Sequence, residues 1–397
     1  MMIQKILTGI IGLTVAGGLS AQNTTNTPTS MYGLGEIAAS DGGKYAGLGS
    51  AGIALNRRGF MNTQNPACIS SMDTTCFVYD IGMTGSYSRY SMLGDFSTAE
   101  TGNPSRVSLG LRLLPGWYAM VGVAPYSSVG YMIKSAQEVE GTNGGQVSSL
   151  FEGTGGLYKL YLTNAFLIGR KISLGVNLGM ISGTVQQTET QESAIVTRKS
   201  EKGAFYVDFG LHYALSKNWS VGGVYGFSTR LKQNGSLTYE NSSTDDDLDV
   251  SLYNEKQFIP QRIGGGLTFE NKRWVVTGDY SWMQWSRNHS SVSSVKYIDQ
   301  HRANLGTVFI MPSRKPNPVE LMMGVGYSNS YVVLKQGKMY NLDLSAGAAF
   351  PIRETVVSLG VTWRKQMNSR SNLMQEDRLT LNLNITFGEK LSRGKIF

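Results

Sequence analysis

The three histidines, His212, His289 and His301, are the first candidates for chemistry in this chain of 397 residues. No two of them have the spacing of metal ligands. His289 precedes two serines, but adjacency in sequence does not make a catalytic dyad, and no nucleophile-elbow motif is present. We therefore expect no catalytic residue, no metal site and no cofactor, and the protein is predicted not to be an enzyme.

Two further patterns bind ligands in other proteins. Gly47-Leu-Gly-Ser-Ala-Gly52 matches the dinucleotide fingerprint, which binds pyrophosphate only between a strand and a helix of a βαβ unit. No such unit is expected here, so these glycines are interpreted as allowing tight backbone turns. The four Asp residues within 245–249 lack the spacing and the glycine of a calcium loop, which favours a solvated acidic loop tip.

The N-terminus has the organisation of a secretory signal. Lys5 precedes an apolar run over 6–18, and Leu19-Ser20-Ala21 resembles a cleavage site, so 1–21 is assigned to the signal peptide. No later apolar run reaches the roughly 18 residues of a membrane helix. The formal net charge is +8, yet Lys and Arg do not cluster, which argues against nucleic-acid binding.

Strict alternation of apolar and polar residues indicates strands with lipid on one side and a polar lumen on the other. It is clearest in Leu379-Thr-Leu-Asn-Leu-Asn-Ile-Thr-Phe387. The pattern predicts an all-β transmembrane antiparallel barrel of about fourteen strands. We place the strands at 75–90, 105–114, 117–133, 156–169, 171–186, 203–215, 218–231, 261–270, 273–285, 302–311, 319–328, 339–350, 355–366 and 378–387.

The connections between these strands alternate between short and long, as in bacterial outer-membrane barrels with periplasmic turns and external loops. This places both termini in the periplasm and the protein in the outer membrane of a Gram-negative cell. The aromatic residues expected at the short-turn end, as in an interfacial girdle, are Trp117, Trp219, Phe269, Trp274, Phe350 and Phe387.

The segment before the first strand is predicted to fill the lumen. Residues 22–74 comprise a polar leader and a glycine-rich stretch that is too apolar to be a disordered tail. The barrel then spans 75–387, and 388–397 form a periplasmic tail without an assigned role. Arg57 and Arg58 in the plug are candidates for contacting a substrate carboxylate. The alternative is that they bond lumen acids such as Asp208, Asp279 or Asp343.

The only two cysteines, Cys68 and Cys76, leave two possibilities open. In an exported, oxidising compartment they can form a disulfide that ties the plug to the first strand. Alternatively, both are buried free thiols.

Pro125 interrupts the third predicted strand. Because proline has no N–H to donate to a ladder, it marks either a simple bulge or a gap in the wall through which an apolar molecule leaves into lipid.

Several of these features resemble the FadL/TodX family of outer-membrane transport proteins. The resemblance rests on Asn65-Pro66-Ala67 before the first strand, on 259–263 (Ile-Pro-Gln-Arg-Ile) and on 274–286. It implies a fourteen-strand barrel, a plug whose signature is Asn65, Pro66 and Ala67, and a kinked third strand at Pro125, Tyr126 and Ser127.

The resemblance also implies passive uptake of hydrophobic small molecules such as long-chain fatty acids, with lateral exit. The partners would be outer-membrane lipid and a hydrophobic substrate. The residues expected in the external loops, 186–202 and 234–249, are mostly polar. The alternative is a FadL-like barrel that serves the type IX secretion system and binds exported proteins or secretion subunits.

Overall fold

A computed structural model describes most of the chain after residue 26. The described residues are 27–38, 43–73, 76–92, 94–138, 146–192, 194–241, 246–252, 256–290, 292–313, 317–334, 337–368 and 374–390. The predicted signal peptide, the start of the leader and the last residues of the predicted tail lie outside this part.

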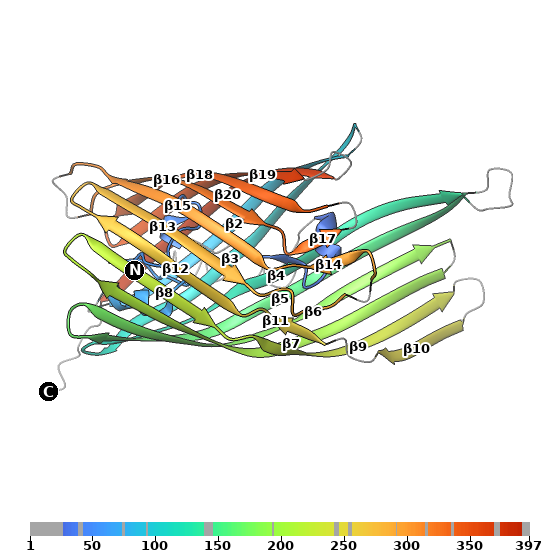
Figure 1. The fold of residues 1–397 in the computed structure, drawn as a ribbon, viewed down its shortest axis with the longest axis horizontal. Coiled ribbons are helices and arrows are strands. Elements are labelled where there is room, and N and C mark those ends of the chain that lie inside the picture. Colours follow the sequence, from blue (N-terminus) through green and yellow to red (C-terminus); the bar gives the residue numbers. More distant parts are fainter. Residues whose placement is uncertain are drawn as a thin grey trace, which may run out of the picture.

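Fourteen strands close into an antiparallel barrel (Figure 1), which confirms the predicted fold. The ring closes because β2 pairs with β20 on one side and with β3 on the other. The barrel strands are β2 (Cys76–Met92), β3 (Asp95–Leu114), β4 (Trp117–Glu138), β5 (Gln146–Ile168), β6 (Ile172–Gln191), β7 (Ala194–Ala214), β8 (Trp219–Gly226), β12 (Arg262–Glu270), β13 (Trp274–Met283), β15 (Gln300–Ile310), β16 (Glu320–Asn329), β18 (Met339–Ile352), β19 (Thr355–Asn368) and β20 (Gln375–Lys390).

The two ends of the barrel differ. Short turns join the strands at one end, here called the turn end, and long hairpins project from the other, here called the hairpin end (Figure 1). Most of the predicted polar loops are in fact strand, over 186–191, 194–202 and 234–241, because β6, β7 and β9 (Thr229–Asn241) continue past the barrel. Two short strands, β10 (Asp246–Leu252) and β11 (Gln257–Ile259), complete this extension.

The alternating pattern behaves as predicted in β20. Leu379, Leu381 and Leu383 are exposed on the outside of the barrel, whereas Thr380 and Asn382 face an internal cavity. The strand also continues past the predicted end of the barrel at Phe387, since Lys390 pairs with Cys76 of β2. Lipid contact outside and polar contact inside therefore explain the pattern.

Aromatic rings gather at the turn end, as expected for an interfacial girdle. Trp219 packs on Phe269 with 4.9 Å between ring centroids, and Trp274 packs on Phe309 at 4.8 Å. Tyr79 stacks on Phe387 at 4.9 Å, which joins the first and last barrel strands at the same level.

The N-terminal part of the chain lies inside the barrel. We call residues 43–73 the plug; they include the short 3-10 helices η2 (Gly43–Tyr45) and η3 (Pro66–Ser71). Its apolar side chains, including Leu48, Ile53, Leu55 and Phe60, are almost completely buried. Residues 27–38, here called the strap, contain η1 (Pro28–Met31) and β1 (Glu36–Ile37). Within the described residues, no helix is long and apolar enough to cross a membrane.

Glycines on the inner wall make room for the plug. A Cβ on Gly306 or Gly324 would collide with Leu48, and one on Gly347 would approach Gly47. Gly49 itself has a φ of +61°, a conformation that side chains disfavour. The glycines of 47–52 therefore serve close packing of the plug, in line with the sequence interpretation.

A small lid covers the lumen at the hairpin end. It consists of β14 (Val295–Tyr297), β17 (Val332–Leu334) and the neighbouring ring of Trp285. Trp285 is buried and stacks on Tyr331 at 4.1 Å, and the Tyr331 hydroxyl donates to the Gly35 carbonyl oxygen of the strap at 2.5 Å. The strap is thus held between the lid and the barrel wall.

Candidate binding cavity and wall gap

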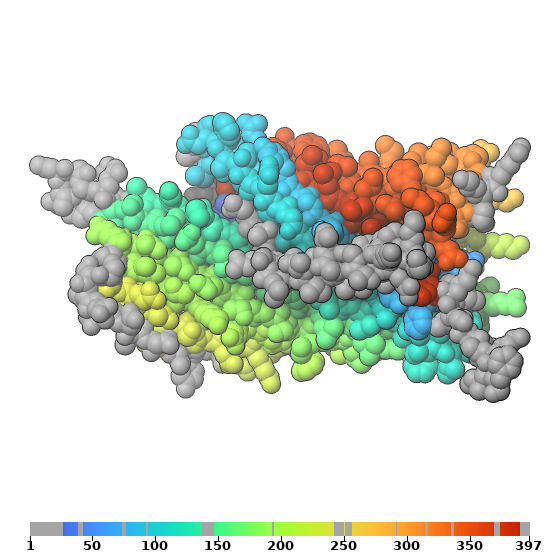
Figure 2. Space-filling model, turned by 180° about the vertical axis from the view of Figure 1, so that it is seen from behind, coloured from blue at the N-terminus to red at the C-terminus, as the bar shows by residue number. Residues whose placement is uncertain are grey.

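The barrel wall is incomplete between β3 and β4. Their ladder runs only from Val107, opposite Val123, to Leu114, opposite Trp117. Beyond Val107 the rest of β3 still pairs with β2, and β4 still pairs with β5. Within the described strands, the hairpin-end halves of β3 and β4 therefore do not pair with each other. Figure 2 shows the barrel from behind, with the hairpin ends of β2 and β3 (cyan) above the green strands β5 to β7.

Two prolines lie where the ladder stops. Pro125 of β4 stands at a register shift against β5, between Pro125 and Ser127, and a second shift in the β2–β3 ladder lies beside Pro104. Neither residue has an N–H for a ladder hydrogen bond. The structure therefore shows a bulge at Pro125 beside the unpaired part of β3 and β4, and the exit of an apolar molecule at this point stays a prediction. Pro104 was missed in the sequence, although the absence of its N–H is the same signal.

The strap takes the place of β3 along the edge of β4. Glu36 pairs with Ser128, Ile37 with Ser127, and the Ala38 amide donates to the Tyr126 carbonyl oxygen at 3.0 Å. Further along, the Thr27 amide donates to the Gly130 carbonyl oxygen at 2.8 Å. The predicted kink residues Tyr126 and Ser127 thus form the edge to which the strap binds.

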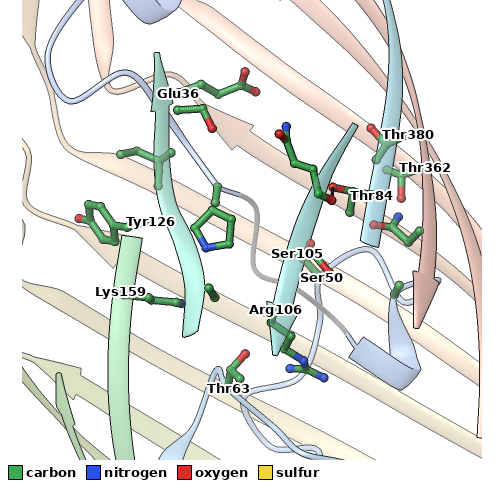
Figure 3. A pocket seen from close by; sticks show the side chains of 18 of the residues that line it. Glu36, Ser50, Thr63, Thr84, Ser105, Arg106, Tyr126, Lys159, Thr362 and Thr380 are labelled. Carbon is green, nitrogen blue, oxygen red and sulfur yellow. Dashed lines mark hydrogen bonds between the residues drawn. The ribbon is translucent and has the colours of Figure 1, made fainter. Parts of the chain in front are cut away.

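A cavity of about 330 Å³ lies between the strap, the plug and the wall gap. Pro125 and Tyr126 line it from one edge of the gap, and Pro104 lines it from the other. Figure 3 shows Tyr126 and Lys159 on one side and Thr84, Thr362 and Thr380 on the other. Hydroxyl, amide and charged groups make up much of the lining, so this is a polar chamber.

Glu36 fastens the strap to the wall across this chamber. Its carboxylate accepts hydrogen bonds from both terminal nitrogens of Arg378, at 3.0 Å for Nη2, and lies 3.9 Å from Nη1 of Arg364. Arg364 also pairs with Asp343, with its Nε 2.7 Å from Oδ1. Glu36 gave no signal in the sequence, because a strand of two residues has no periodicity.

The plug signature docks the plug on the wall and does not line the cavity. The Asn65 side chain is fully buried, donates to the carbonyl oxygens of Ile53 at 2.7 Å and Leu211 at 3.0 Å, and caps η3 by accepting from the Ala67 amide. Pro66 and Ala67 lie against Gly175 of β6, where a Cβ would collide with them.

Arg57 and Arg58 lie away from the cavity, near the turn end. The Arg57 guanidinium donates to Glu270 at 3.1 Å, to Glu320 at 3.3 Å and to the Tyr45 hydroxyl at 2.8 Å. Arg57 therefore bonds lumen acids, as the alternative proposed, but different ones from Asp208, Asp279 and Asp343. Arg58 is exposed and pairs with Asp73 at 2.9 Å.

Asp279 has a different role from the one considered for it. Its carboxylate accepts hydrogen bonds from the backbone amides of Gly52 and Ile53, the latter at 2.8 Å. It thereby holds the plug backbone against β13.

Cys68 is a buried free thiol, which contradicts a Cys68–Cys76 disulfide and agrees with the alternative for this residue. Its Sγ lies 3.6 Å from the Ile53 carbonyl oxygen, and burial, assisted by the Asp279 charge, raises the pKa of the thiol well above its ordinary value. The side chain of Cys76 lies outside the described part of the chain.

The histidines do not converge on a reaction centre. Nδ1 of His212 lies 3.4 Å from the Asn56 amide nitrogen in the lumen, and His301 pairs with the Tyr280 hydroxyl at 2.7 Å on an exposed face. Over the described residues, His, Cys, Asp and Glu form no group of three or more that could hold a metal ion.

A family model described as BamG matches residues 2–393. The chain belongs to the BamG family. No curated protein matches the chain.

Solved structures share the fold at low sequence identity. The toluene transporter TodX of Pseudomonas putida has a TM-score of 0.60 at 13% identity, over 91% of this chain and 100% of its own. The toluene transporter TbuX of Ralstonia pickettii has a TM-score of 0.56 at 10% identity, over 89% of this chain and 99% of its own. A FadL homologue of Pseudomonas aeruginosa has a TM-score of 0.57 at 12% identity, over 88% and 98%.

These similarities confirm the FadL/TodX resemblance as a resemblance of fold. The architecture is that of an outer-membrane barrel, as predicted. The neighbours are named as channels, transporters or a FadL homologue, in line with the prediction that the chain is not an enzyme.

Proposed function

We propose that the protein is a passive outer-membrane channel for hydrophobic small molecules such as long-chain fatty acids, which leave sideways through the gap between β3 and β4. The observation that carries this proposal is the end of the β3–β4 ladder at Val107 and Val123 beside an internal cavity. Several solved neighbours are named as toluene transporters or monoaromatic hydrocarbon channels, which supports the substrate class.

Entry would take place from the hairpin end. Val129, Tyr131 and Val185 form a buried apolar cluster at the hairpins, and Met31 of the strap and Phe151 pack against it. Displacement of the strap would expose this cluster to an apolar molecule that comes from outside. Both termini are proposed to be periplasmic, which places the hairpin end outside the cell.

Sideways exit is favoured over axial exit by the packing of the plug. Below the cavity the plug backbone rests directly on wall glycines, so an axial route would require the whole plug to move. At the gap only the strap must move. Val107 and Val123 point outwards there and are 51% and 45% exposed, so the opening leads to a surface suited to lipid tails.

The proposal is tested by tying the strap to β4. Ile37 and Ser127 are directly opposite, and the adjacent Ala38–Tyr126 pair carries the backbone hydrogen bond, so I37C and S127C lie in a closely spaced non-hydrogen-bonded pair. The double variant, made in a C68S/C76S background, is reconstituted into liposomes, and entry of labelled oleate and of toluene is measured.

We expect oxidation to stop entry and reduction to restore it, because the strap cannot leave the gap while it is crosslinked. Each single-cysteine variant, treated with the same oxidant, is the matched control. Equal rates for the oxidised and reduced double variant would refute lateral exit. No entry of any hydrophobic probe into liposomes with the uncrosslinked protein would refute the channel itself.

A second candidate function is docking of exported proteins or of type IX secretion subunits. The hairpins of β6, β7 and β9 continue past the lipid-facing band, and their outer faces carry polar residues such as Gln186, Lys199 and Asn234. Such a surface suits contact with a protein more than contact with lipid. Crosslinking in intact envelopes from K199C tests this: recovered exported or secretion proteins support it, and adducts with lipid only contradict it.

A further inference from the structure

The cavity contains more cationic than acidic side chains. Six Lys or Arg residues and three Asp or Glu residues line it. Three of the arginines have acidic partners: Arg106 pairs with Asp80, Arg364 with Asp343, and Arg378 with Glu36 and Glu376. A chamber built only to pass apolar molecules has no need of this charge.

Two cavity arginines differ from these three. Arg262 and Arg302 form no ion pair or hydrogen bond within the described part of the chain, and the Nε of Arg262 is buried without a partner. A buried guanidinium N–H without an acceptor is costly. An anion bound in the cavity would supply that acceptor.

Strand register brings the two side chains within reach of one ligand. Arg262 on β12 is opposite Met283 of β13, and Arg302 on β15 is opposite Ser281 of the same strand. The two arginines therefore flank β13 with a stagger of two residues, so their Cα atoms are about 12 Å apart: about 10 Å across two strand spacings and about 7 Å along the strand. Both line the same cavity, so two long side chains can converge on a group between them.

Acidic groups surround these cations without forming an ion pair with either arginine within the described residues. Asp208 is within electrostatic range of Arg262 and Lys159, Asp279 is within range of Arg262, and Asp343 is within range of Arg302. A phosphate monoester carries about −1.5 to −2 at neutral pH and offers oxygens that match the guanidinium fork.

We propose that Arg262 and Arg302, with Lys159, form a phosphate-binding site in the lumen. The ligand class is a phosphate monoester, either free or attached to an acyl chain. Hydroxyl groups of Thr362 and Thr380 and the Asn382 amide line the rest of the chamber and suit a polar, hydrated group. The site does not depend on the transport proposal, because an anion can bind here whether or not the strap moves.

The test is calorimetric titration of the full-length protein, purified in dodecyl maltoside, with three probes. Inorganic phosphate tests for a free ligand, hexyl phosphate for a headgroup on a chain, and hexyl glucoside is the uncharged control. We expect one or both phosphates to bind and the glucoside not to bind. Binding of inorganic phosphate alone, or of hexyl phosphate alone, then tells the two sources apart.

Variants locate the site. R262Q/R302Q should weaken phosphate binding by about tenfold or more, because a hydrogen bond to a charged group contributes this much. R273Q, which changes an exposed arginine in a short turn, is the matched control and should bind as the wild type does. D208N removes an acidic group of the site, so binding should tighten, a result that misfolding cannot produce.

No binding of either phosphate to the wild-type protein would overturn the proposal. Equal affinities of the wild type, R262Q/R302Q and D208N would also overturn it, because the anion would then bind elsewhere. Liposome entry that fails while phosphate still binds would reject the channel and leave this site standing.

Discussion

Asn65→Ala is the sharpest perturbation that the structure offers. The side chain is fully buried and takes part in three hydrogen bonds that hold the plug together: two donated to the carbonyl oxygens of Ile53 and Leu211, and one accepted from the Ala67 amide. At about 1 kcal/mol net for each bond, the substitution should destabilise plug docking by about 3 kcal/mol.

The barrel wall itself should remain intact. Only the Leu211 bond reaches a wall strand, and that carbonyl group stays in its ladder. The loss of stability should therefore appear as easier release of the plug and not as unfolding of the barrel.

Hydrogen exchange followed by mass spectrometry distinguishes these two outcomes. If the plug amides exchange through plug release, a loss of about 3 kcal/mol accelerates their exchange by about a hundredfold. Amides of β6 and β7 should exchange at the wild-type rate. Asn234→Ala, which changes an exposed side chain on the outer face of β9, is the matched control.

Two results would refute this reasoning. Exchange in η3 that accelerates less than about threefold would mean that the three bonds contribute little beyond what water supplies. Equal acceleration in the plug and in β6 would mean that plug and wall open together as one unit.

Three other substitutions have defined outcomes. Gly175→Ala places a methyl group against the Pro66–Ala67 backbone and should lower the stability of the detergent-solubilised protein to heat by about 1–3 kcal/mol. Gly223→Ala, whose methyl group enters open space, is the control and should leave that stability unchanged. Equal losses in the two variants would contradict the packing argument. Trp285→Ala removes a buried ring of the lid that stacks on Tyr331 at 4.1 Å, and it should cost about 3–5 kcal/mol of local stability, seen as faster proteolysis within 286–299. Unchanged cleavage would show that the lid does not depend on this ring. Arg58→Ala removes an exposed ion pair and should change the free energy of unfolding by less than about 1 kcal/mol in urea titration, so a larger loss would indicate a contact beyond Asp73.

Much of the barrel could be predicted because lipid imposes a strict rule on each strand. Wherever one face touches lipid and the other a polar lumen, residues alternate, as Leu381 and Asn382 do in β20. The rule disappears where strands leave the membrane. In the β6–β7 hairpin both faces carry polar groups, so Gln187 and Arg198 were predicted to be loop residues although they are paired in a ladder.

The cavity was much less accessible from sequence. Pro125 could be identified in the sequence as an interruption of its strand. The extent of the gap could not, because it depends on where β3 stops pairing with β4, and the sequence of one strand does not determine that point. Likewise, the inward phase of Arg302 follows from alternation, whereas the absence of an ion-pair partner for it among the described residues depends on side chains from distant strands.

The plug signature was found by resemblance, but its role was not. Asn65 acts through the backbones of Ile53 and Leu211, contacts that no local pattern encodes. Local sequence does not encode the role of Glu36 either, because its partner Arg378 lies on β20, the last strand of the barrel.

The pairing of β2 with β20 makes the cylinder an all-or-none object. A chain that stopped before β20 would leave two unpaired strand edges, along β2 and along β19. Each edge would present a row of amide and carbonyl groups without hydrogen-bond partners in the hydrocarbon core of the bilayer. No stable intermediate with a narrower circumference is available, because every strand is already shared by two neighbours. Pairing of β20 with both β19 and β2 therefore decides whether the other thirteen strands have a place in the bilayer.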